Sequence, residues 1–217
     1  PADRSVSLFP PDILPNLARR AKLARRKRGQ CVARDGQGLE LSNADAGAVA
    51  ALDFVREEWL VFGNRLAEFI AAADKEENCL LLPLVAANLV LSMNSTEGFE
   101  AAERYVARAK TMSVGANARE LAWLAATEAW IAGDTDRSLE LHEEMVAQWP
   151  RDLLAAKLGQ LHALNCGDAE ALLRIGERIV PANGDNHYVW GMYALGLEEC
   201  HRLDEAVLRQ NLSKSAA

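Results

Sequence analysis

Apolar side chains recur every three to four residues along most of this chain, the spacing typical of helices that pack through one face. Such stripes predict helices within residues 12–28, 44–62, 65–73, 80–91 and 99–109. The 80–91 segment is apolar almost throughout, so we expect it to be central and buried. Residues 29–38 have the glycine content of a loop, and no segment alternates with period two for long enough to predict a strand. We therefore predict an all-α fold.

A spacing of 34 residues organises the C-terminal half. Gly133-Asp134 recurs as Gly167-Asp168, and the next step falls on His201-Arg202. Five places after each corner stands a small or apolar residue: Ser138, Leu172 and Ala206. Because 34 residues is the length of one tetratricopeptide (TPR) helix–turn–helix unit, the spacing favours a TPR-like α-solenoid of antiparallel helix pairs.

The predicted repeat pairs are 119–132 with 136–148, 153–165 with 169–179, and 186–199 with 203–212. Pro150 and Pro181 are expected to end the second helices of the first two pairs, since proline lacks a hydrogen-bond donor. Upstream, residues 44–73 and 78–110 are predicted to form two looser pairs, with Gly63-Asn64 dividing the first. Ser42 or Asn43 is expected to cap the helix that follows it, and Asn94-Ser95-Thr96 the helix at 99–109. The predicted organisation is an arm and basic helix at 1–34, then a repeat domain at 35–217.

Charge is distributed unevenly along the chain. Seven basic residues lie within ten positions: Arg19, Arg20, Lys22, Arg25, Arg26, Lys27 and Arg28. Subtracting these seven charges from the net charge of −7 leaves −14 for the rest of the chain. An acidic body repels a nucleic-acid duplex, and no aromatic residue interrupts the basic run, so nucleic acid is an unlikely partner.

Three interpretations of the basic run stay open: a nuclear-localisation or nucleic-acid patch, a transit-like or membrane-surface helix, and a helix that docks on the acidic body. We expect a cytoplasmic protein, with organelle or nuclear targeting by residues 12–28 as the alternative. No apolar run is long enough to predict a transmembrane helix.

Reactive residues are scattered. His142, His162, His187 and His201 show no metal-ligand spacing, and each is expected at a surface or a helix end. Cys166 and Cys200 fall at equivalent repeat corners, where small apolar residues pack; a histidine-lowered thiol pKa is the alternative. Neither a metal site nor a cofactor is predicted, and no catalytic residues are assigned.

Several segments resemble the tetratricopeptide repeat protein 38 family. The likeness is carried by Arg119-Glu120-Leu121, by Ala126 to Asp134, by the run from Trp149 to Lys157, and by the run from Tyr188 to Glu199. It extends more weakly to Asp35-Gly36, Leu41-Ser42 and Asp45-Ala46. The resemblance implies a TPR-like helical array over roughly residues 35–210. Members of that family continue into a histidine-bearing helix and further pairs, so no role of those histidines carries over.

Binding residues follow from the repeat register. In a TPR unit the first helix of each pair lines the concave face, and the register places these residues there: Glu120, Trp123, Thr127, Trp130 and Ile131; Leu154, Lys157, Leu161, Leu164 and Asn165; and Tyr188, Gly191, Leu195, Glu198 and Glu199. From this set we predict a partner-binding site made of Glu120, Trp123, Thr127, Trp130, Lys157, Leu161, Tyr188 and Glu198, since tryptophan, tyrosine and buried apolar anchors dominate binding interfaces. The equally weighted alternative is that the same face packs on a neighbouring helix or on the basic helix.

The function expected from the sequence is a non-catalytic scaffold that binds a protein or peptide. A helical enzyme or small-ligand-binding protein is the rival class, and a nucleic-acid-associated protein is the third. Val207, Leu208 and Leu212 on the last helix also predict self-association through the C-terminal pair, since an uncapped array leaves an apolar face open.

Overall fold

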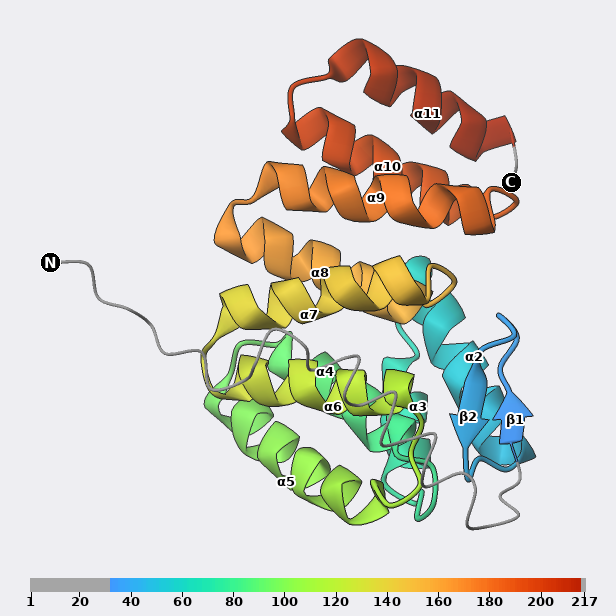
Figure 1. Cartoon of the computed structure of the whole chain (residues 1–217), viewed down its shortest axis with the longest axis vertical. Helices are drawn as coiled ribbons and strands as arrows, with labels where there is room; N and C mark the ends of the chain where they lie inside the picture. The colour runs from blue at the N-terminus through green and yellow to red at the C-terminus, as the bar shows by residue number, and fades with distance from the viewer. Residues whose placement is uncertain (1–31, 216–217) are drawn as a thin grey trace, which may run out of the picture.

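The computed structural model describes the backbone of residues 32–215 and side chains as far as Asn211 (Figure 1). This part of the chain is all-helical apart from one short hairpin, as the apolar pattern predicts. The basic helix predicted at 12–28, and nearly all of the arm at 1–34, lie outside the described residues.

A two-stranded antiparallel hairpin opens the described chain, and the prediction that no strand forms is wrong here. Strand β1 (Val32–Arg34) pairs with β2 (Glu40–Ser42), with Ala33 opposite Leu41. In the turn, the Asp35 carboxylate accepts hydrogen bonds from the backbone N–H groups of Gln37 and Leu39. Three-residue strands are too short for a period of two to stand out, and only Leu41 becomes fully buried.

Four helices follow, close to their predicted positions. They are α2 (Ala46–Leu60), α3 (Leu66–Ala73), α4 (Leu81–Leu91) and α5 (Thr96–Met112). Ser95 caps α5 by accepting from the Gly98 N–H, as predicted. The cap of α2 is Asp45, which accepts from the Ala48 N–H, so the prediction of Ser42 or Asn43 is wrong by a few residues.

Helix α4 is the buried centre of this region. Ten of its eleven residues are buried, and it packs against α5 and α6. Pro83 falls in its first turn, where backbone N–H groups have no helical partner to lose. The prediction of a central helix at 80–91 is therefore confirmed.

Three helix pairs make up the C-terminal half. They are α6 (Ala118–Ile131) with α7 (Thr135–Gln148), α8 (Leu153–Cys166) with α9 (Ala169–Asn183), and α10 (His187–Glu199) with α11 (Leu203–Ser215). Each helix packs on the next along the chain, and Figure 1 shows them as successive layers from α6 to α11.

The three corners of these pairs adopt one conformation at the 34-residue spacing. Gly133, Gly167 and His201 have φ of 80°, 70° and 59°. The residue after each corner donates its N–H five residues back, to Ala129, Ala163 and Leu197 respectively. These are the bonds of a Schellman helix end. The spacing thus records a repeated backbone turn.

Helix α9 continues through Pro181 to Asn183, so the predicted end near residue 179 is wrong. The proline stands in the last turn, where it removes one hydrogen bond and leaves the rest of the helix intact. The Asn183 side-chain amide donates to the Ile179 carbonyl and to the Pro150 carbonyl of the preceding pair, and so helps to satisfy this helix end.

Candidate functional site

The α6 share of the predicted binding face is closed. Glu120, Trp123 and Thr127 have no exposed surface, and Trp130 keeps only 6%. In this structure a partner has no access to the first three, because the hairpin, α4 and α8 pack over them. The alternative prediction, that this face packs on neighbouring elements, describes α6.

Glu120 holds the hairpin to the repeat region. Its carboxylate accepts from the Ser42 N–H at 2.7 Å and from the Asn117 N–H at 2.9 Å, which completes a capping box at the start of α6. Burial raises the pKa of this carboxyl, and the two N–H donors act in the opposite direction. The residue therefore has a structural role.

Trp123 belongs to a buried ionic cluster. Asp152 accepts from the Arg119 guanidinium at 2.8 Å and from the Trp123 indole N–H at 2.9 Å, and its other oxygen caps α8 through the Ala155 N–H. Both charged side chains are almost fully buried. Burial alone would lower the pKa of Arg119, but Asp152 raises it, so the pair stays ionised.

Thr127 and Trp130 are also held by internal contacts. The Asn88 amide of α4 donates to the Thr127 hydroxyl, which donates to the Trp123 carbonyl. The Trp130 ring meets the His162 ring edge-to-face, with centroids 4.5 Å apart. Aromatic pairs of this geometry stabilise cores as well as interfaces.

The prediction that His142 and His162 lie at the surface or at helix ends is wrong. Both are fully buried, and their ring centroids lie 5.2 Å apart between α7 and α8. His142 Nδ1 lies 2.7 Å from the Ser138 carbonyl, so this nitrogen carries the proton. The Ser138 hydroxyl lies 3.1 Å from both the Ala126 carbonyl and His162 Nε2; since the carbonyl takes its proton, His162 donates to it. Burial lowers the pKa of His142 to about 4 and that of His162 to about 3, so both rings are neutral.

The α8 and α10 share of the predicted face remains accessible. Lys157, Leu161, Tyr188 and Leu195 are half-buried, whereas Leu164 is 45% exposed and Glu198 is exposed. The Gln160 amide links the two helices, since it donates to the Met192 carbonyl at 2.9 Å. The structure therefore divides the predicted site: four α6 residues lie in the interior, and Lys157, Leu161, Tyr188 and Glu198 lie at the surface.

Lys157 has an unusual environment. Its ammonium lies 3.8 Å from the centre of the Phe62 ring, and within the described chain it makes neither an ion pair nor a hydrogen bond. Burial lowers its pKa. Phe62, at a turn with φ of 54°, is 81% exposed although aromatic. Sequence reasoning missed Phe62, because the 34-residue register does not extend upstream to the end of α2.

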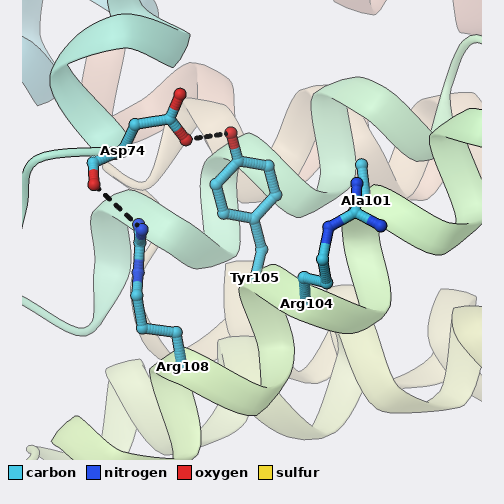
Figure 2. Close-up of a pocket in the computed structure, with 5 residues that line it drawn as sticks. All are labelled: Asp74, Ala101, Arg104, Tyr105 and Arg108. Carbon is cyan, nitrogen blue, oxygen red and sulfur yellow. Dashed lines mark hydrogen bonds between the residues drawn. The ribbon is translucent and has the colours of Figure 1, made fainter.

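A second accessible site lies beside α5 and was not predicted. A cavity of about 420 Å³ is lined by Asp74 from the end of α3 and by Ala101, Arg104, Tyr105 and Arg108 (Figure 2). The four α5 residues share one helix face because they are spaced i, i+3, i+4 and i+7. That spacing of two arginines around a tyrosine is visible in the sequence and was the available signal.

The corner cysteines differ from expectation. Cys166 is exposed, and its thiol lies 3.4 Å from an Asp136 carboxylate oxygen, so the prediction that it packs as a small apolar residue is wrong. Burial and this carboxylate raise the pKa of Cys166, which also contradicts a lowered thiol pKa. Cys200 is half-buried and packs against the cluster of Leu173, Leu197 and Ala206.

Comparison with known proteins gives no match: no family model, no curated protein and no solved structure is similar to this chain. Between residues 32 and 215, no helix is long and apolar enough to cross a membrane. The same residues hold no group of three or more histidine, cysteine or acidic side chains placed to bind a metal.

Proposed function

We propose that this chain is a non-catalytic scaffold that binds a protein or peptide partner through the surface of α8 and α10. This surface, the α8–α10 face, consists of Phe62, Lys157, Leu161, Leu164, Tyr188 and Leu195. The proposal includes a TPR-like array akin to the tetratricopeptide repeat protein 38 family, and a cytoplasmic setting.

The observation that carries the proposal is the unpaired Lys157 under an exposed Phe62 ring. Isolated folded chains rarely leave a desolvated cation without a carboxylate and a large aromatic ring in water. Removal of both from water by a partner would strengthen the cation–π contact, since such contacts gain when desolvated.

The surroundings fit an interface. Leu161, Leu164 and Leu195 provide apolar area, and Tyr188 adds an aromatic side chain with a polar end. Glu198 and Glu199 are exposed at the end of α10 and provide a charged rim. An apolar centre with a polar rim is the usual composition of a binding surface.

Peptides selected from a random display library on the wild-type chain test this proposal. Lys157→Met and Leu164→Ser are expected to weaken the selected peptides about tenfold or more, because a few central residues carry most binding energy. Arg178→Met on α9 and Val114→Ser after α5 are matched controls, since both side chains are exposed away from this face. Peptides that bind all four variants alike would contradict the α8–α10 face.

Self-association through α11 is a second proposal, on a different observation. Leu203, Val207 and Leu208 are each more than half exposed on this last helix. We expect light scattering to show a mass that rises with concentration, and Val207→Ser with Leu208→Ser to abolish the rise. A wild-type mass that stays monomeric at high concentration would contradict the proposal.

A further inference from the structure

The cavity beside α5 has a geometry that the scaffold function does not use. Figure 2 shows Tyr105 pointing from α5 to Asp74, with the Arg104 and Arg108 side chains on opposite sides of its ring. The two guanidinium groups therefore flank one opening at the junction of α3 and α5.

Arg108 is fixed in place without being neutralised. Its guanidinium donates to the backbone carbonyls of Ala73 and Asp74 at the end of α3, and its central carbon lies 5.4 Å from the centre of the Tyr105 ring. Backbone carbonyls at a helix C-terminus carry a partial negative charge, which orients the cation and leaves most of its charge uncompensated.

The one carboxylate that lines the cavity is already engaged. Asp74 accepts the Tyr105 hydroxyl at 2.6 Å, and it forms an ion pair with neither arginine. Burial, and then the bond to Asp74, raise the pKa of Tyr105 to about 12, so the phenol stays neutral and keeps donating. The Asp74 charge is in this way directed towards tyrosine.

Arg104 has no fixed partner in the described part of the chain. It is exposed, and it makes neither a hydrogen bond nor an ion pair, although Glu100 and Glu103 precede it on α5. Two arginines without carboxylate partners are notable in a chain whose net charge is −7.

We propose that this cavity binds a small organic dianion whose two oxyanion groups are separated by a short apolar link, such as a short dicarboxylate. Guanidinium groups recognise oxyanions through paired, charge-assisted hydrogen bonds. Because the two arginines stand on opposite sides of Tyr105, a two-headed anion reaches both and a single-headed anion reaches one. The volume of about 420 Å³ lies in the range of small-ligand sites.

The test compares succinate with butyrate, which has the same carbon chain and one carboxylate fewer. Each is titrated into the full chain at constant ionic strength and near-neutral pH, and backbone amide NMR shifts at residue 74 and residues 101–108 are followed. We expect saturable shifts there, with succinate binding about tenfold or more tightly than butyrate, as expected for one additional charge-assisted pair.

Arg104→Met separates specific binding from general charge attraction. Arg104 makes no contact whose loss would unfold the chain, so this variant should fold normally and bind succinate no better than butyrate. Arg178→Met removes another exposed, unpaired arginine from α9 and should leave the succinate preference unchanged. The proposal is overturned if succinate shows no preference in the wild type, or if both variants lose it equally.

Discussion

The imidazole rings of His142 and His162 lie 5.2 Å apart at an interplanar angle of 46°, and both are closed off from solvent. Each ring uses one nitrogen in a hydrogen bond to Ser138, and the other nitrogen, His142 Nε2 or His162 Nδ1, has no protein partner. A proton added to either ring would be buried and would repel a proton on the other.

Stability is therefore expected to fall on acidification. In the folded chain the pKa values of about 4 and about 3 lie below the ordinary 6.5, so the unfolded chain binds more protons between these limits. The free energy of unfolding should be highest above pH 6.5 and should decrease as the pH falls towards about 4, by about 1.4 kcal/mol per pH unit for each histidine. Urea unfolding across this pH range measures the slope.

Substitution identifies the residues responsible for that slope. Asp35 and Glu120 have raised pKa values and act in the opposite direction at lower pH, so the informative quantity is the difference between variants. His162→Gln should reduce the slope, whereas exposed His201→Gln should leave it unchanged. Equal slopes in wild type and His162→Gln would refute the assignment.

Arg119→Met is predicted to be among the most damaging substitutions. It leaves the Asp152 carboxylate buried with only the Trp123 and Ala155 N–H groups, and an uncompensated buried charge costs about 3–5 kcal/mol. Arg65→Met removes an ion pair with Glu68 whose side chains are more than half exposed, and should cost less than about 1 kcal/mol. Chemical denaturation of both variants decides whether the buried pair differs from the surface pair.

Local chemistry accounts for what the sequence predicted correctly. The Schellman corners at Gly133 and Gly167 and the Ser95 cap depend on residues within five positions of one another, so spacing reveals them. The covering of α6 depends on distant partners. Asn88 reaches Thr127 across 39 positions, and Ser42 reaches Glu120 across 78.

A helical period cannot show whether a face is open or covered by another helix, because both cases need apolar residues at the same positions. Trp123 and Trp130 therefore have the sequence pattern of binding residues and the environment of core residues. Lys157 and Tyr188 occupy the same register positions on later helices, and they stay accessible because nothing equivalent to α4 covers them in the described chain.

The repeated corners predict opposite effects for two substitutions. Gly167 has φ of 70° with open space where a Cβ would lie, so Gly167→Ala should cost about 1 kcal/mol through backbone strain alone. His201 occupies the same conformation with a side chain, so His201→Gly should stabilise the α10–α11 pair by up to about 1 kcal/mol. Hydrogen exchange of the α11 amides measures the second effect, and faster exchange in His201→Gly would contradict it.

Close backbone contact between α9 and α10 gives the last prediction. A Cβ at Gly196 would lie 2.6 Å from the Leu173 Cα and 2.9 Å from the Leu173 nitrogen, both backbone atoms that no side-chain rotation can move. Gly196→Ala should therefore force the helices apart and cost about 1–3 kcal/mol or more. Gly47→Ala in α2 is the matched control, since the nearest atom to its Cβ is a carboxylate oxygen of Asp45 at 3.2 Å. Alanine favours the helix by up to about 1 kcal/mol, so this control should be neutral or stabilising. Denaturation midpoints that shift in the same direction for both variants would show that helix propensity, and not the α9–α10 contact, governs Gly196.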